Sequence, residues 1–172
     1  MTASSLDYSF IFTVVFSAAL VLGLLTRLYL ASRQIRYVAQ HSSRVPDAFA
    51  ATILLDAHQK AASYTITKAR FGLLEMAFGA AVLLSWTLLG GIDTLNKAVN
   101  QAGLTSYGSL VPQLALIAAF AIISGVLDLP FTLYSTFKIE ERFGFNKMTF
   151  KLWLTDMVKG LAVGAVIGLP II

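Results

Sequence analysis

Long stretches without a charged residue are the feature that most constrains the fold of this chain. The first runs from Tyr8 to Thr26, and about 20 residues at roughly 1.5 Å each are enough to cross the hydrocarbon of a bilayer. The second covers Met76 to Ile92, and the third lies within Ala98 to Leu127. Each of these stretches predicts a transmembrane helix.

Composition excludes the main alternatives to a membrane protein. Of the 172 residues, 57% are hydrophobic and 13% are charged, whereas soluble domains carry about 25% charged residues. A soluble fold of this size leaves about a third of its surface in water, which is too much for so apolar a chain. Disorder is excluded for the same reason. The absence of Cys removes disulfides, thiolate nucleophiles and Cys-based zinc sites.

The last segment, WLTDMVKGLAVGAVIGLPII, contains Asp156 and Lys159 in its first half. Only residues 160–172 are uncharged, and this is too short to span a bilayer. We therefore predict that the fourth membrane helix begins near Phe150 and includes both charges. Because nothing polar follows Ile172, we expect a partner or a longer protein to complete the chain. The N-terminus, which has no Lys or Arg before Arg27, indicates a retained anchor rather than a signal peptide.

The distribution of Lys and Arg predicts the orientation of the helices. Seven basic residues lie between the first two helices and four between the last two, whereas the remaining loop holds Lys97 alone. This bias places the N-terminus and residues 93–109 outside, and both basic connections in the cytoplasm. We therefore predict an all-α fold, with one polytopic membrane domain over residues 1–172. Its four membrane helices lie at about 8–30, 70–92, 108–129 and 150–172, and its cytoplasmic connections at about 31–69 and 130–149.

The first cytoplasmic connection predicts an amphipathic helix after Pro46. Its apolar positions recur at helical spacing: Phe49, Ile53, Leu54, Ala57 and Ala61. No Gly or Pro occurs from Ala48 to Phe71, so we expect this helix to run into the second membrane helix without a break. It either lies on lipid headgroups or packs against a further domain of the same protein.

The second cytoplasmic connection, FTLYSTFKIEERFGFNK, mixes aromatic and charged residues. It follows Pro130, which tends to end or kink a helix. Gly144 and Asn146 are suited to a turn. We predict a folded element whose rings dock on protein, although aromatic belts at membrane interfaces would explain part of the same pattern.

Ionisable residues at membrane depth mark candidate functional positions, since each costs about 2.5 to 3.5 kcal/mol at a helix centre. The candidates are Glu75, Asp128, Asp156 and Lys159. Glu75 and Asp128 lie near helix ends and can reach the headgroups, whereas the i, i+3 spacing of Asp156 and Lys159 allows a mutual ion pair. The last helix also carries two overlapping GxxxG patterns at Gly160, Gly164 and Gly168, which predict a closely packed neighbouring helix.

The residues themselves predict no catalytic, cofactor-binding or metal site. There are two His, His41 and His58, and no HExxH pair. A Ser/His/Asp arrangement, a phosphate-binding loop and a G-x-S-x-G elbow are also absent from the sequence. We expect no nucleic-acid partner, because topology explains the basic residues.

The two connections resemble a known family. PFTLYSTFKIEERFGFNKMT, preceded by VPDAFAATILLDAHQKAASYTITKARFGLLE, is similar to the N-terminal membrane region of type I CAAX prenyl proteases and their bacterial relatives. These proteins are integral-membrane zinc metalloendopeptidases. The matching positions are Pro130, Tyr134, Thr136, Phe137, Ile139, Glu140, Gly144, Phe145 and Asn146, and Arg142 and Lys147 lie in the same segment.

The resemblance implies long helices around a chamber, with a zinc site formed by HExxH and a downstream Glu in the C-terminal half. In such a site zinc activates water and the motif Glu acts as general base. None of those ligands is present here, so we expect a helical wall that is inactive alone, with zinc and a peptide substrate only in the complete protein. The implied partners are the lipid bilayer and a C-terminal catalytic domain or zinc-binding partner, on which Glu140 to Lys147 are expected to dock.

Two other functions are compatible with the same residues. A stand-alone membrane scaffold or regulatory subunit would lack peptidase activity. A small transporter or channel would use Glu75, Asp128 or Asp156, but it ranks last because the sequence shows no internal repeat. The expected location is a multi-pass position in a bacterial inner membrane, with the endoplasmic reticulum as the eukaryotic alternative.

Overall fold

The computed structural model describes residues 4–168, which form helices joined by turns and short irregular segments, with no strand in that range. The α-helices are α1 (Ser4–His41), α2 (Leu55–Thr87), α3 (Gly91–Gln101), α4 (Leu110–Tyr134) and α5 (Phe150–Gly168). Two short 3-10 helices, η1 (Asp47–Phe49) and η2 (Leu104–Tyr107), lie in connections, and a π-helical segment, η3 (Ser135–Glu140), continues α4. The predicted all-α class is confirmed. Residues 169–172 of the predicted last helix lie outside the described range.

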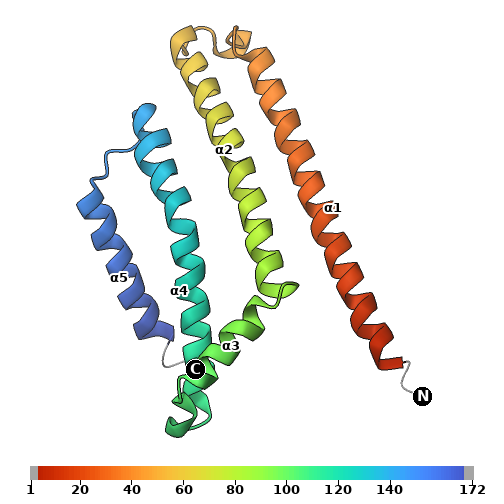
Figure 1. Ribbon diagram of the computed structural model, residues 1–172. Coiled ribbons are helices and arrows are strands. Elements are labelled where there is room, and N and C mark those ends of the chain that lie inside the picture. The colour runs from red at the N-terminus through yellow and green to blue at the C-terminus, as the bar shows by residue number, and fades with distance from the viewer. Residues whose placement is uncertain (1–3, 169–172) are drawn as a thin grey trace.

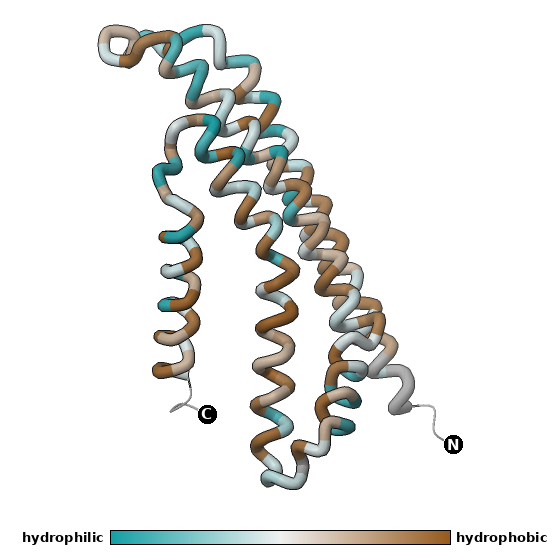
Figure 2. The backbone as a smooth tube through the Cα atoms, turned by 60° about the vertical axis from the view of Figure 1, so that its left-hand side comes forward, coloured by the Kyte–Doolittle hydropathy of each residue, from teal (hydrophilic) through white to brown (hydrophobic). Residues whose placement is uncertain are grey.

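The long helices run up and down, so that the two predicted cytoplasmic connections lie at the same end of the molecule (Figure 1). The hairpin formed by α1 and α2 extends past the end of α4, while α3 crosses at the opposite end. Hydrophilic residues gather towards the hairpin tip, and hydrophobic residues cover much of α4 and the lower part of α1 (Figure 2).

Three helical segments of the described chain are long and apolar enough to cross a membrane: Phe10–His41, Leu55–Thr87 and Leu110–Glu140. Large apolar side chains on α1, such as Phe10 and Phe12, are about 70% exposed in the isolated chain (69% and 71%). Such a surface is stable only against lipid or protein. The shorter α5 carries Lys151, Asp156 and Lys159 and is not among the three candidate spans.

The helix boundaries differ from the predicted ones at the hairpin end. α1 continues to His41 instead of ending near residue 30, because Ile35 and Val38 extend the half-buried side of this helix. The predicted amphipathic helix does begin within the first connection and continues unbroken into the second membrane helix, as α2. However, residues 47–54 form η1 and a turn rather than its first turns.

The second membrane helix ends at Thr87 rather than near residue 92, and most of a further helix, α3, lies in the predicted loop at 93–109. Ile92, Leu95 and Val99 recur at i, i+3 and i+7 and make one apolar side, on which Val99 is 8% exposed. The tight turn before it uses Gly90, whose φ is +78°.

Pro130 does not end the third membrane helix near residue 129. α4 continues through it to Tyr134, and η3 follows directly. A proline removes one backbone hydrogen bond, and the next residue, Phe131, contacts the rings of Phe71 and Phe78 at 6.0 and 4.7 Å between centroids. These ring contacts hold the helix in place beyond the proline.

Ring contacts also define how the other helices pack. Trp86 of α2 meets Phe120 of α4 at 5.0 Å, whereas α1 packs on α2 along a shallow groove lined by small residues such as Gly23 and Gly79. α5 is attached to η3 mainly through Phe137, whose ring lies 6.0 Å from Phe150 and 6.4 Å from Trp153.

The close neighbour predicted for the glycines of α5 is not present in the described part of the chain. A Cβ atom added at Gly160, Gly164 or Gly168 would meet no heavy atom within 4 Å. The GxxxG prediction was therefore wrong for the packing of α5 in this chain.

Candidate functional site

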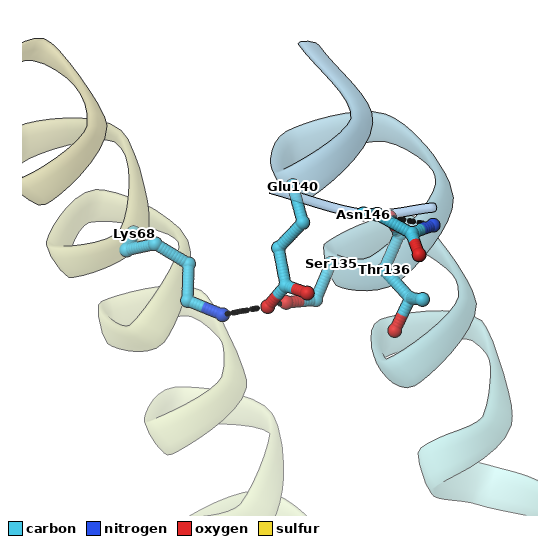
Figure 3. A network of polar contacts seen from close by, with 5 residues as sticks. All are labelled: Lys68, Ser135, Thr136, Glu140 and Asn146. Carbon is cyan, nitrogen blue, oxygen red and sulfur yellow. Dashed lines mark hydrogen bonds and ion pairs between the residues drawn. The ribbon is translucent and has the colours of Figure 1, made fainter. Parts of the chain in front are cut away.

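The segment that carries the family resemblance folds back on α2, and we call residues 135–148 the motif hook. Its best buried side chains are Ile139, 4% exposed, and Phe143, 9% exposed. Lys68 Nζ on α2 forms an ion pair with Glu140 Oε1 at 2.9 Å and donates a hydrogen bond to Ser135 Oγ at 3.0 Å (Figure 3). One lysine thus contacts both ends of η3.

A tight turn after η3 depends on Gly144, whose φ is +78°. The backbone N–H groups of Phe145 and Asn146 both donate to the Glu140 carbonyl oxygen, at 2.9 and 3.3 Å. This arrangement gives the Glu140 carbonyl oxygen, at a helix end, the hydrogen bonds that the helix itself no longer supplies. The left-handed conformation explains why glycine stands at this position.

Asn146 closes the motif hook with its side chain. Its Nδ2 donates to the Thr136 carbonyl oxygen at 3.0 Å (Figure 3). Its Oδ1 accepts from the Met148 N–H at 2.6 Å. The amide therefore joins the start of η3 to the chain that leads into α5. Neither a carboxylate nor an aliphatic side chain could make both bonds.

Aromatic rings complete the contact with α2. Tyr64 lies 5.4 Å from Phe143 and 4.7 Å from Phe145 between ring centroids, and Phe71 lies 5.1 Å from Tyr134. Tyr64, Lys68 and Phe71 are spaced i, i+4 and i+7, so they lie on one side of α2. The motif hook packs on this side of α2.

The predicted motif residues divide into four groups. Those that hold the motif hook together or against α2 are Tyr134, Thr136, Ile139, Glu140, Gly144, Phe145 and Asn146. Phe137 contacts α5 instead, and Pro130 lies within α4. Arg142 and Lys147 are exposed and form no ion pair with any described residue, although the Arg142 guanidinium lies 5.8 Å from the Phe143 ring centre.

The four predicted intramembrane polar residues are not brought together. Glu75, Asp128, Asp156 and Lys159 lie on three different helices and are all exposed. The ion pair that the spacing of Asp156 and Lys159 allowed is not formed between them. Their helix, α5, leaves both side chains in open space, where nothing favours one pairing geometry. Within residues 4–168 no group of three or more His, Asp or Glu side chains could hold a metal ion.

Sequence reasoning missed Tyr64, Lys68, Phe71 and Ser135. Lys68 lies in a segment that carries the family resemblance, but it was not singled out there and was used only as one of the charges that set topology. A usable signal was present, because Lys68 is a single cation between two aromatic residues on one side of a helix.

A bundle of long apolar helices, closed at one end by a hook that is held by an ion pair and aromatic contacts, defines an integral-membrane helical domain. The sequence pattern described as CAAX prenyl protease N-terminal, five membrane helices, matches residues 34–172. The chain belongs to this family. Its membrane location and the predicted family resemblance are thereby confirmed, whereas the count of four membrane helices is not, since the family description gives five.

Curated relatives support the assignment. The chain is 31% identical over 150 residues to CAAX prenyl protease 1 homolog of Oryza sativa and 30% identical over 151 residues to CAAX prenyl protease 1 of Saccharomyces cerevisiae. Each alignment covers 84% of this chain but only 34% and 33% of the relative. The chain therefore spans about a third of the length of these relatives. Both come from eukaryotes and give no support to the expected bacterial membrane.

A solved structure has the same fold. The crystal structure of S. mikatae Ste24p superposes with a TM-score of 0.83 at 27% sequence identity, covering 92% of this chain and 37% of that chain. The helical arrangement described above is therefore that of the N-terminal membrane portion of the family.

Proposed function

We propose that this chain forms part of the membrane wall of a CAAX prenyl protease-like zinc metalloendopeptidase and has no peptidase activity alone. Family membership over residues 34–172 supports the proposal. The chain contains no HExxH, so zinc and the general base have to come from another part of the complete enzyme.

The motif hook is, in this proposal, a rigid platform for that catalytic part. The observation that supports this proposal is that some residues of the motif hook contact α2 while others are exposed. Glu140 and the rings of the motif hook contact α2. Arg142 and Lys147, in contrast, are exposed and have no described ion-pair partner. We therefore narrow the docking surface from the whole of Glu140–Lys147 to these two cations.

The orientation belongs to the same proposal. Both basic connections lie at one end of the bundle (Figure 1), as the distribution of Lys and Arg requires if this end is cytoplasmic. Because the chain has no Cys, a single introduced thiol reports on its own position. An impermeant maleimide should label Ser43→Cys only from the cytoplasmic side and Ser109→Cys only from the other side.

The test of the platform is a chimera in which this chain replaces the matching third of the Saccharomyces cerevisiae relative. Removal of two exposed ion pairs costs about 0.4 to 2 kcal/mol, so R142A/K147A should lower the peptidase rate about two- to thirty-fold. The control, R44A/K97A, removes two cations elsewhere and should keep the rate of the parent chimera.

Two results would count against the proposal. An R142A/K147A chimera with the parent's rate and zinc content would remove the platform role. An unmodified chimera that folds and holds zinc, yet cleaves no peptide, would count against the membrane-wall role and favour a scaffold or regulatory subunit.

A further inference from the structure

The outward side of α1 carries basic and aromatic side chains that we call the basic stripe: Tyr29, Arg33, Arg36, Tyr37 and Gln40. Tyr29, Arg33, Arg36 and Gln40 follow one another at spacings of four, three and four residues, so they stand on one side of the helix. The five residues together line a shallow hollow at the helix surface.

Arg33 and Arg36 of the basic stripe lie on the side of α1 away from α2, the helix on which α1 packs, whereas Tyr37 and Gln40 also border the hollow between the two helices. The half-buried side of this part of α1 is formed by Leu24, Leu28, Ala31, Ile35 and Val38. At about 100° per residue these positions lie opposite Arg33 and Arg36. α1 also stands at the edge of the bundle (Figure 1), and Tyr29 and Tyr37 are 60% and 62% exposed. No described segment covers the stripe.

The positive charge of the stripe is not neutralised by the chain around it. No Asp or Glu occurs between Asp7 and Asp47. Arg44 pairs with Asp47 at 2.7 Å, whereas Arg33 and Arg36 take part in none of the ion pairs formed among residues 4–168. The two guanidinium groups, one helical turn apart, are therefore available to an anionic partner.

The depth of the stripe indicates what that partner is. It follows shortly after the uncharged stretch from Tyr8 to Thr26, which is where tyrosine and arginine side chains meet lipid headgroups. A guanidinium fork matches two oxygens of a phosphate, and a tyrosine hydroxyl can donate a further hydrogen bond. Anionic lipids attract basic residues next to a membrane helix.

We propose that the basic stripe binds the phosphate of an anionic phospholipid headgroup. This binding is independent of the proposed peptidase role and adds a lipid ligand at the hairpin end of α1. Because free phosphate has the same chemistry, the experiment has to separate the two sources. An acidic segment of a longer polypeptide is a different partner, and its presence would contradict the proposal.

The experiment is a native mass spectrometry titration of the chain in neutral detergent with phosphatidylserine, phosphatidylcholine or inorganic phosphate. We expect phosphatidylserine to bind more tightly than phosphatidylcholine. Each arginine near an anionic surface contributes about five-fold to affinity, so R33Q/R36Q should weaken phosphatidylserine binding about 25-fold. R33K/R36K, which keeps the charge but loses the forks, should weaken it less.

The matched control is R142Q/K147Q, which removes two cations at the same end of the molecule and should change the affinity little. Equal affinities for R33Q/R36Q and this control would overturn the proposal. Displacement of bound phosphatidylserine by inorganic phosphate at the same concentration would overturn the lipid as the source. Lipid binding by the full-length chimera that does not respond to R33Q/R36Q would show that another segment covers the stripe, and would also overturn it.

All of these variants should keep the thermal unfolding curve of the parent, because the substituted side chains are exposed and take part in none of the described ion pairs. The R33K/R36K variant keeps the charge of the helix, so it remains a test if the glutamine variant unfolds. In that case, the proposal would be contradicted if the lysine variant bound phosphatidylserine no more tightly than phosphatidylcholine.

Discussion

Lys68 and Glu140 are 72 residues apart in the sequence, yet their side chains form an ion pair at 2.9 Å. Both side chains keep about a third of their surface exposed, 37% and 32%. The pair fixes the position of η3 along α2, and Ser135 on the same lysine fixes its rotation. The consequences of this contact can be measured.

Removal of either partner should destabilise the motif hook. We expect K68M and E140Q each to lower the free energy of unfolding by about 1 kcal/mol, with a coupling energy near 0.5 kcal/mol in the double variant, since exposed pairs contribute about 0.2 to 1 kcal/mol. Thermal unfolding in detergent provides the measurement. R70M, an exposed neighbour on α2 without an ion pair, is the control. A coupling energy of zero would show that the contact contributes nothing.

Asn146 should control the order of the turn that follows η3. N146A removes the bonds to the Thr136 carbonyl oxygen and from the Met148 N–H, at a cost of about 1 to 3 kcal/mol. We expect hydrogen exchange at residues 141–148 to become faster, while exchange in α1 is unchanged. N146D, which retains the acceptor but not the donor, should give an intermediate rate. Unaltered exchange in N146A would contradict the role of this side chain.

Gly91 should resist substitution because its surroundings leave no space. A Cβ atom there would lie 2.7 Å from the Ser85 carbonyl oxygen and 2.9 Å from Trp86 Cε3. G91A should therefore lower stability by about 1 to 3 kcal/mol, since overpacking forces neighbouring atoms to shift. G125A is the control, as its Cβ would meet nothing within 4 Å and helix interiors favour Ala by about 0.5 to 1 kcal/mol. Equal unfolding temperatures for the two variants would count against the close packing at α3.

Gly164 should tolerate a large side chain in this chain alone. Nothing described lies within 4 Å of a Cβ at that position, so G164L should leave thermal unfolding in detergent unchanged. A marked loss of stability would mean that α5 packs more closely than the described contacts indicate, and would restore the original GxxxG prediction.

The three candidate membrane spans could be predicted from the sequence because each contains a long uncharged apolar stretch, whereas the charged α5 is not among them. Tyr8–Thr26 and Met76–Ile92 need only length and hydropathy to be recognised, although α2 ends at Thr87 and Ile92 belongs to α3. α3 was missed because its polar residues outnumber the apolar ones and only Ile92, Leu95 and Val99 make an apolar side. The extent of α4 was missed because the local effect of Pro130 is overcome by Phe131, which contacts two rings of α2.

The candidate site was predicted from one side only. The motif residues, including Glu140 and Asn146, were identified by resemblance, but their partners on α2 were not. A contact between Lys68 and Glu140 depends on how two helices pack, and no local pattern in either segment specifies it. The same limit explains why the charges of Arg142 and Glu140 could not be separated into an outward and an inward role.

In the proposed function, the attachment of the motif hook to α2 supports the peptidase of the complete enzyme. Charge reversal at Lys68 and Glu140 in the chimera tests it most directly. We predict that K68E and E140K each lower the peptidase rate, and that the double variant K68E/E140K recovers most of it because the ion pair is rebuilt with opposite polarity. Single variants with the parent's rate, or a folded double variant that remains as slow as the singles, would contradict the claim.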